Sequence, residues 1–164
     1  MDLYPWIVFI HIAGAFVFAM SHGVGAWSSF QLDKERDPAR VRTLLDLMGA
    51  SLTGVYIGLL VLLVGGIWAG IAGSHFGRGW IWTSLVLLIA IAVAMYLMAT
   101  RYYATLREAV GIRSQQTKKD APDPVPVGQA ELEAILARNP SAPLAAVGFG
   151  GLALIVFLMV LKPF

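Results

Sequence analysis

The sequence predicts an all-α membrane protein, a bundle of four transmembrane helices with both termini outside the cytoplasm. Hydrophobic residues make up 58% of the 164 residues and charged residues only 13%, whereas soluble domains carry about a quarter charged residues. Four apolar stretches are also long enough to cross a hydrocarbon core of about 30 Å at about 1.5 Å per residue. The lipid bilayer is therefore the first expected partner.

The four spans form one membrane domain and cover roughly residues 6–28, 47–73, 80–103 and 144–161. The pair Asp37-Pro38 is typical of a helix N-cap followed by proline in the first turn, so a short polar helix should run directly into the second span. A glycine-rich turn at residues 74–79 predicts that spans two and three are antiparallel neighbours. We expect this hairpin to be the firmest contact of the fold.

Residues 112–140 form a polar connection before the fourth span. Its first part, 114–128, is rich in proline and charge, which predicts a flexible linker. Residues 131–138 are patterned as a short amphipathic helix that Asn139-Pro140 ends, and Ser141 is the expected cap of span four.

Lysine and arginine are distributed unevenly between the two sides of the predicted bundle. Ten lie in the connections after spans one and three and two on the opposite side, so the positive-inside rule places those connections in the cytoplasm. This predicts a bacterial inner-membrane protein with both ends outside. The basic pI of 9.1 follows from the same asymmetry, and nucleic acid is not an expected partner. The N-terminal residues 1–6 carry an acid and lack the basic region of a secretory signal, so the first span should be retained.

The chain has no cysteine, which excludes disulfides, iron–sulfur clusters and thiolate metal sites. Small residues recur at four-residue spacing in spans one and two, as in Gly54-Val55-Tyr56-Ile57-Gly58. Such patterns allow helix backbones to approach closely, either within the bundle or in a homo-oligomer.

Two of the three histidines lie within span one. An ionisable group inside a membrane is a functional-site hypothesis by default. His11 and His22 are eleven residues apart, so they lie about 16 Å apart along the helix and within about 20° of one face. We therefore expect both to point into the same side of the bundle. His75 falls in the outer turn and is expected to be solvated.

Depth along the spans suggests partners for each histidine. His11 is predicted to lie level with Trp68 and with Thr83 or Ser84, and His22 level with Tyr56 and with Met95 or Tyr96. One interpretation is a neutral imidazole that bonds to these hydroxyl groups and holds helices together. The other is haem ligation, with neutral imidazole as one axial ligand and Met, Tyr, water or nothing as the second. A haem held by two histidines would need a second subunit.

Several motifs carry a resemblance: Ile10-His11-Ile12, Ser21-His22-Gly23, the run from Glu35 to Arg40, and Arg78-Gly79-Trp80-Ile81-Trp82. On these, spans one to three resemble an uncharacterised family of small bacterial four-helix membrane proteins. More distantly, the chain is similar to the haem-containing membrane protoporphyrinogen oxidases and to the copper resistance protein D family. The oxidase resemblance implies that His11 binds haem b together with a lysine on helix three, whose place is held here by Ser84.

The leading hypothesis is a haem-binding, or alternatively metal-binding, protein of membrane electron transfer. Its candidate cofactor-binding residues are His11, His22, Tyr56, Ser84 and Met95. No catalytic residue and no metal cluster is assigned, and whether the protein is an enzyme stays open. The alternative is a non-catalytic accessory subunit of a larger respiratory or transport complex. A small transporter ranks last, because no span carries a charged residue to couple to ions.

Overall fold

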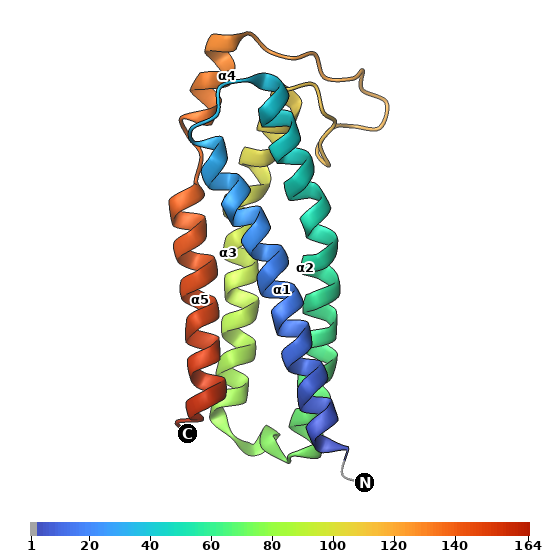
Figure 1. Ribbon diagram of the computed structural model, residues 1–164, viewed down its shortest axis with the longest axis vertical. Coiled ribbons are helices and arrows are strands. Elements are labelled where there is room, and N and C mark those ends of the chain that lie inside the picture. Colours follow the sequence, from blue (N-terminus) through green and yellow to red (C-terminus); the bar gives the residue numbers. More distant parts are fainter. Residues whose placement is uncertain (1–2) are drawn as a thin grey trace.

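The computed structural model describes residues 3–164 (Figure 1). Met1 and Asp2, and with them the acid of the N-terminal segment, lie outside the described residues. The described chain is helical and contains no strand. Its elements are α1 (Tyr4–Leu32), α2 (Pro38–Ala72), the 3₁₀ helix η1 (His75–Gly77), α3 (Gly79–Ala109), α4 (Gln129–Leu136) and α5 (Ser141–Leu161). Four of the helices are long and apolar enough to span a membrane, which confirms the predicted four-helix bundle.

The four long helices run side by side along the longest axis of the molecule (Figure 1). Both termini and η1 lie at one end, which we call the termini end. The α1–α2 connection, the linker and α4 lie at the other, the linker end. An even number of crossings places both termini on one side of the membrane, and which side that is stays a prediction from the distribution of lysine and arginine.

The prediction that spans two and three form the firmest contact of the fold is wrong. α2 packs most closely on α1, and α3 packs mainly on α5, while α2 and α3 make few backbone-level contacts with each other. The connection explains this: Gly73 to Arg78 is not a tight reversal but includes a left-handed Ser74 and a 3₁₀ turn, which is long enough to separate the two helix ends.

Glycines explain why α1 and α2 pair so closely. A Cβ built on Gly14 of α1 would lie 2.9 Å from the Cα of Leu62 on α2, and one on Gly58 of α2 would lie 2.8 Å from the Cα of Phe18 on α1. The small-residue pattern at Gly54 and Gly58 therefore serves packing inside the bundle.

The buried apolar core lies at the linker end. Its fully buried side chains come from α1, α2, α3 and α4: Leu32, Val41, Leu45, Leu106, Leu132 and Leu136. Along the spans, by contrast, many large apolar side chains are exposed. This is the distribution expected when lipid surrounds the spans and water surrounds the linker end.

The helix boundaries test the cap predictions. The Asp37 side chain accepts a 3.0 Å hydrogen bond from the backbone N–H of Ala39, which confirms it as the N-cap of α2. The expected cap of α5 is wrong: Ser141 is already the first helical residue and makes no cap bond. Its hydroxyl instead donates to Asp33 at 2.6 Å.

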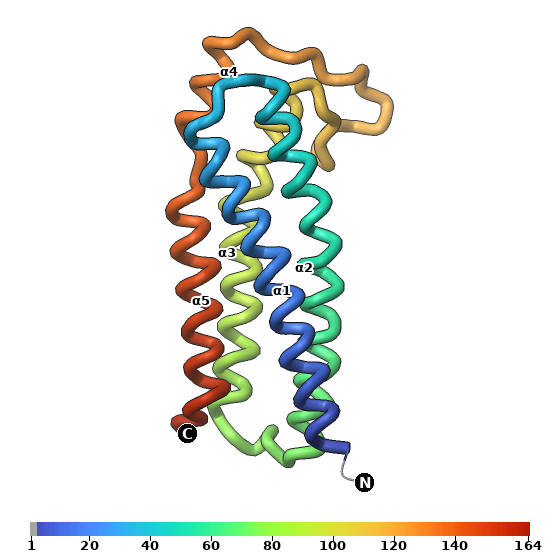
Figure 2. The backbone as a smooth tube through the Cα atoms, viewed as in Figure 1, coloured from blue at the N-terminus to red at the C-terminus, as the bar shows by residue number. Residues whose placement is uncertain are grey.

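The linker loops out beyond the start of α2 and returns across the linker end to α4 (Figure 2). Arg113 donates to the backbone carbonyls of residues 118, 119 and 121 and pairs with Asp123 at 2.9 Å. The N–H of Val127 donates to the carbonyl of Ala109 at 3.0 Å. α4 then begins at Gln129, two residues before the predicted amphipathic helix.

Candidate functional site around two histidines of α1

His11 is half-buried on the first third of α1 and contacts α2. Its Nδ1 lies 2.7 Å from the backbone carbonyl oxygen of Leu62. Because a carbonyl only accepts, Nδ1 carries the hydrogen and donates, which leaves Nε2 with its lone pair. Within residues 3–164, Nε2 has no hydrogen-bond partner.

Two glycines of α2 make room for this ring. A Cβ on Gly65 would lie 2.9 Å from the backbone nitrogen of His11, and one on Gly66 would lie 2.8 Å from the imidazole Cε1. Any side chain at either position would displace the histidine, so the sequence Gly65-Gly66 is what allows His11 to reach the backbone of the neighbouring helix.

The hydroxyl partners predicted for His11 are engaged elsewhere. Ser84 is buried on α3, and its hydroxyl donates to the carbonyl of Trp80 at 2.8 Å, within its own helix. Thr83 likewise donates to Gly79. On α2 the residue that lies against the His11 backbone is Gly65, whose built Cβ would lie 2.9 Å from the His11 nitrogen. At the termini end of the same pair of helices, the Tyr4 hydroxyl is hydrogen-bonded to His75 at 3.1 Å.

His22 lies deeper along α1 and meets different helices. Its ring stacks on Phe18 at a centroid distance of 5.7 Å and meets the edge of Phe149 on α5 at 5.8 Å. A Cβ on Gly148 would lie 2.7 Å from His22 Nε2 and 3.6 Å from the Met95 methyl carbon. His22 and Met95 therefore meet at one glycine of α5, and this is the one predicted grouping that the structure brings together.

Tyr56 does not join that group. Its side chain is 65% exposed on α2, and Tyr96, the other hydroxyl predicted to lie level with His22, is 66% exposed on α3. Both rings lie on the outer surface of the bundle. His22 has no hydrogen-bond partner for its ring among the described residues.

The two histidines thus meet different neighbours, although we expected them to share one side of the bundle. α1 is tilted across the bundle, from the side of α2 at the termini end toward α5 at the linker end (Figure 1). One face of a tilted helix can therefore meet α2 at His11 and α5 at His22.

His75 is less solvated than expected. It is half-buried in η1, bonded to Tyr4 and packed 5.7 Å from the Trp80 ring. Within residues 3–164 no three His, Asp or Glu side chains lie close enough to hold a metal ion together.

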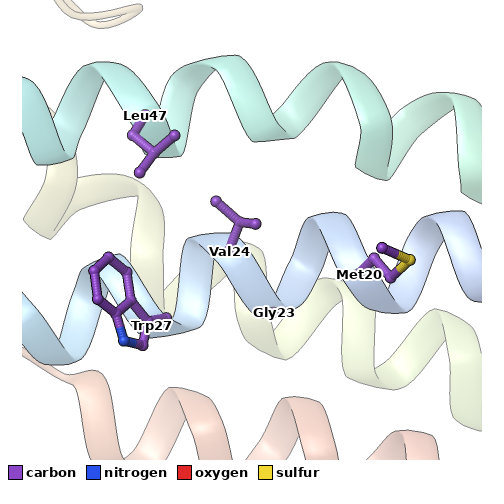
Figure 3. Close-up of a pocket in the computed structure, with 5 residues that line it drawn as sticks. All are labelled: Met20, Gly23, Val24, Trp27 and Leu47. Carbon is purple, nitrogen blue, oxygen red and sulfur yellow. The ribbon is translucent and has the colours of Figure 1, made fainter.

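An apolar depression of about 510 Å³ opens on the outside of the α1–α2 pair (Figure 3). Met20, Gly23, Val24 and Trp27 of α1 line it together with Leu47 of α2. The depression contains no titratable group and neither histidine, so its chemistry suits an apolar surface rather than a reaction.

A polar cluster at the linker end was not predicted. The Asp33 carboxylate accepts from Asn139 at 2.7 Å and from Ser141 at 2.6 Å, while the Asn139 amide also donates to the carbonyl of Ser29. Ser29 in turn is hydrogen-bonded to the Tyr103 hydroxyl at 2.6 Å. The available signal was that Asp33 ends one span and Asn139-Pro140-Ser141 begins another on the same side.

The chain matches no protein-family model, no curated protein and no solved structure.

Proposed function

We propose that this integral membrane protein binds haem b through His11 and serves electron transfer within the membrane. The observation that carries the proposal is the 2.7 Å hydrogen bond from His11 Nδ1 to the carbonyl of Leu62. Histidines that ligate a metal commonly donate their second ring nitrogen to a backbone carbonyl, which fixes the tautomer and the ring orientation. Bound haem would supply a one-electron iron centre.

The chain's own contribution is to present an oriented imidazole. The bond to Leu62 holds the proton on Nδ1, and the close packing against Gly65 and Gly66 restricts the ring. Nε2 is then the ligating atom. No lysine, arginine or acid lies in the apolar stretch around it.

If haem binds at His11, a second protein ligand would come from outside this part of the chain. Met95 reaches the surroundings of His22 rather than those of His11, and Ser84 is bonded to its own helix. The remaining candidates for that position are water, no ligand, or a residue of a second subunit. The proposed assembly as a homo-oligomer or within a larger membrane complex would supply such a residue.

His22 is the weaker candidate. Its Nε2 packs against the backbone of Gly148, and the rings of Phe18 and Phe149 cover it. An iron at Nε2 would require α5 to move away from α1. The contacts of His22 are those of a side chain that packs helices together.

The absorption spectrum of the protein, purified in mild detergent after haem supplementation, tests the proposal. We expect a Soret band that His11→Ala removes and that the matched variant His22→Ala retains, with helical content equal in both by circular dichroism. A band that persists in His11→Ala refutes His11 as the ligand. A wild-type protein that stays folded without a band refutes haem binding.

The alternative is a non-catalytic subunit of a larger membrane complex. The depression around Gly23 favours it, because nothing lies within 4 Å of a Cβ built there and its lining is apolar. A transmembrane helix of a partner would fit such a surface. This function predicts a haem-free protein that changes its assembly state when Gly23→Leu fills the depression.

A further inference from the structure

A second pocket lies between α3 and α4, at the point where α3 leaves its apolar stretch. Its volume is about 210 Å³, and its lining comprises Arg101, Tyr102 and Thr105 of α3, with Ile135 of α4 and Arg138 just after it. A water molecule takes up about 30 Å³ of liquid. The pocket can therefore hold a group of several heavy atoms.

Its two arginines differ from the other arginines at the linker end. Five of these have partners within the chain: Arg36, Arg40, Arg42, Arg107 and Arg113 bond to carboxylates or backbone carbonyls. Arg101 and Arg138 make no side-chain hydrogen bond or ion pair with any residue from 3 to 164. The two unpaired guanidinium groups of this end thus line one pocket.

The Tyr102 hydroxyl adds an independent signal. It is buried, yet it has no hydrogen-bond partner among the described residues. A buried hydroxyl without a partner is unfavourable, and the same side chain lines the pocket of the two arginines. A ligand with acceptor oxygens would pair with both guanidinium groups, and a turn of the Tyr102 ring toward the pocket would let the same ligand accept from its hydroxyl, which has no exposed surface as it stands.

Phosphate is the acceptor group that fits this donor set. Arginine binds phosphate oxygens in a bidentate manner, and basic pockets beside transmembrane helices on the cytoplasmic side accept phospholipid headgroups. Tyr102 and Arg101 lie at the end of the apolar stretch 80–103, which is the depth of the lipid phosphates, and Ile135 provides an apolar wall. This position favours a lipid over a free ion.

We propose that the pocket formed by Arg101, Tyr102 and Arg138 binds the phosphate group of an anionic phospholipid. The site ties α4 to α3 through the lipid and is independent of haem binding. A basic residue at an anionic surface contributes about 1 kcal/mol, which is about five-fold in affinity per arginine. Loss of both arginines should therefore weaken binding by roughly 25-fold.

The full-length protein in a neutral detergent is titrated with short-chain phosphatidylglycerol, and in parallel with phosphatidylcholine and with inorganic phosphate. Tryptophan fluorescence reports the thermal unfolding midpoint at each concentration. We expect phosphatidylglycerol to raise the midpoint more strongly than the other two. Arg101→Gln/Arg138→Gln should lose that preference, and Tyr102→Phe should lose part of it.

The matched control is Lys118→Gln/Lys119→Gln, which removes the same charge from the linker at the same end of the molecule. An equal loss of the phosphatidylglycerol preference in this control means that diffuse electrostatic attraction, and not the pocket, binds the lipid, which overturns the proposal. Equal stabilisation by phosphatidylcholine overturns it as well, and an equal effect of inorganic phosphate assigns the pocket to a free anion. If the double arginine variant is unfolded in phosphatidylcholine, the single variants Tyr102→Phe and Arg138→Gln provide the test. Retention of the full phosphatidylglycerol preference in both of them refutes the proposal.

Discussion

Gly58→Ala tests the close contact between α1 and α2. The new Cβ would lie 2.8 Å from the Cα of Phe18 and closer still to its backbone nitrogen. Optimal carbon–carbon separation is about 3.5–4.0 Å, and backbone atoms cannot rotate away, so the helices must separate by roughly 1 Å along the contact. Overpacking of this kind costs about 1–3 kcal/mol.

Gly23→Ala is the matched control, because it makes the same substitution within α1 at a position where nothing lies within 4 Å of the new Cβ. The helix-propensity gain of up to about 1 kcal/mol is common to both variants. The two should therefore differ by about 1–3 kcal/mol, with Gly58→Ala the less stable. Unfolding in mixed micelles with rising dodecyl sulfate, followed by far-ultraviolet circular dichroism, measures this difference. Equal midpoints, or a higher midpoint for Gly58→Ala, would refute the close backbone approach.

Three further outcomes are expected. A cysteine introduced at Lys118 should be shielded from an impermeant thiol reagent in intact cells while one at His75 is labelled, and the reverse pattern would invert the predicted orientation. Asp33→Ala should destabilise the folded protein by about 2 kcal/mol, since it removes a charged acceptor from the Ser141 hydroxyl, and the same unfolding titration with Asp33→Asn as control measures it. The pKa of Glu35 lies below its ordinary value of 4.5 because the backbone N–H groups of Asp37 and Arg36 donate to its carboxylate. This stabilisation of the folded protein is present above pH 4.5 and is lost as the pH falls through the lowered pKa. A carboxyl NMR titration of Glu35 with a midpoint at or above 4.5 would contradict it.

The number, length and order of the spans follow from composition, because lipid imposes a length and an apolar character on each crossing. The N-cap at Asp37 follows in the same way from local chemistry. The choice of which helices touch does not follow from composition or local chemistry, because it depends on side-chain shape at positions far apart in sequence. Gly14 and Gly58 each meet backbone of the neighbouring helix, whereas a Cβ built on Gly23 of α1 meets nothing within 4 Å.

In the candidate site, too, local sequence predicted part of the arrangement and helix packing decided the rest. The presence of His11 in a span indicated a polar contact, but its partner is a main-chain carbonyl, and every residue of α2 has one of those. Only the register between α1 and α2 selects Leu62. Met95 beside His22 was found from depth alone, because both side chains are long enough to tolerate an error of a turn. Asp33 was missed as a partner of Ser141 since the pattern at Ser141 suggested a cap.

The bond between Asp33 and Ser141 links the end of α1 to the beginning of α5. During synthesis α1 and α2 can pair as soon as residue 72 has emerged, yet the Asp33 carboxylate then lacks the donors that residues 139 and 141 later provide. Until α5 enters the membrane, the emerging bundle holds an acid at its boundary in contact with water. The arrival of α5 gives that carboxylate its donors and partly covers it, so these polar bonds at the linker end form only once α1 and the start of α5 are both in place.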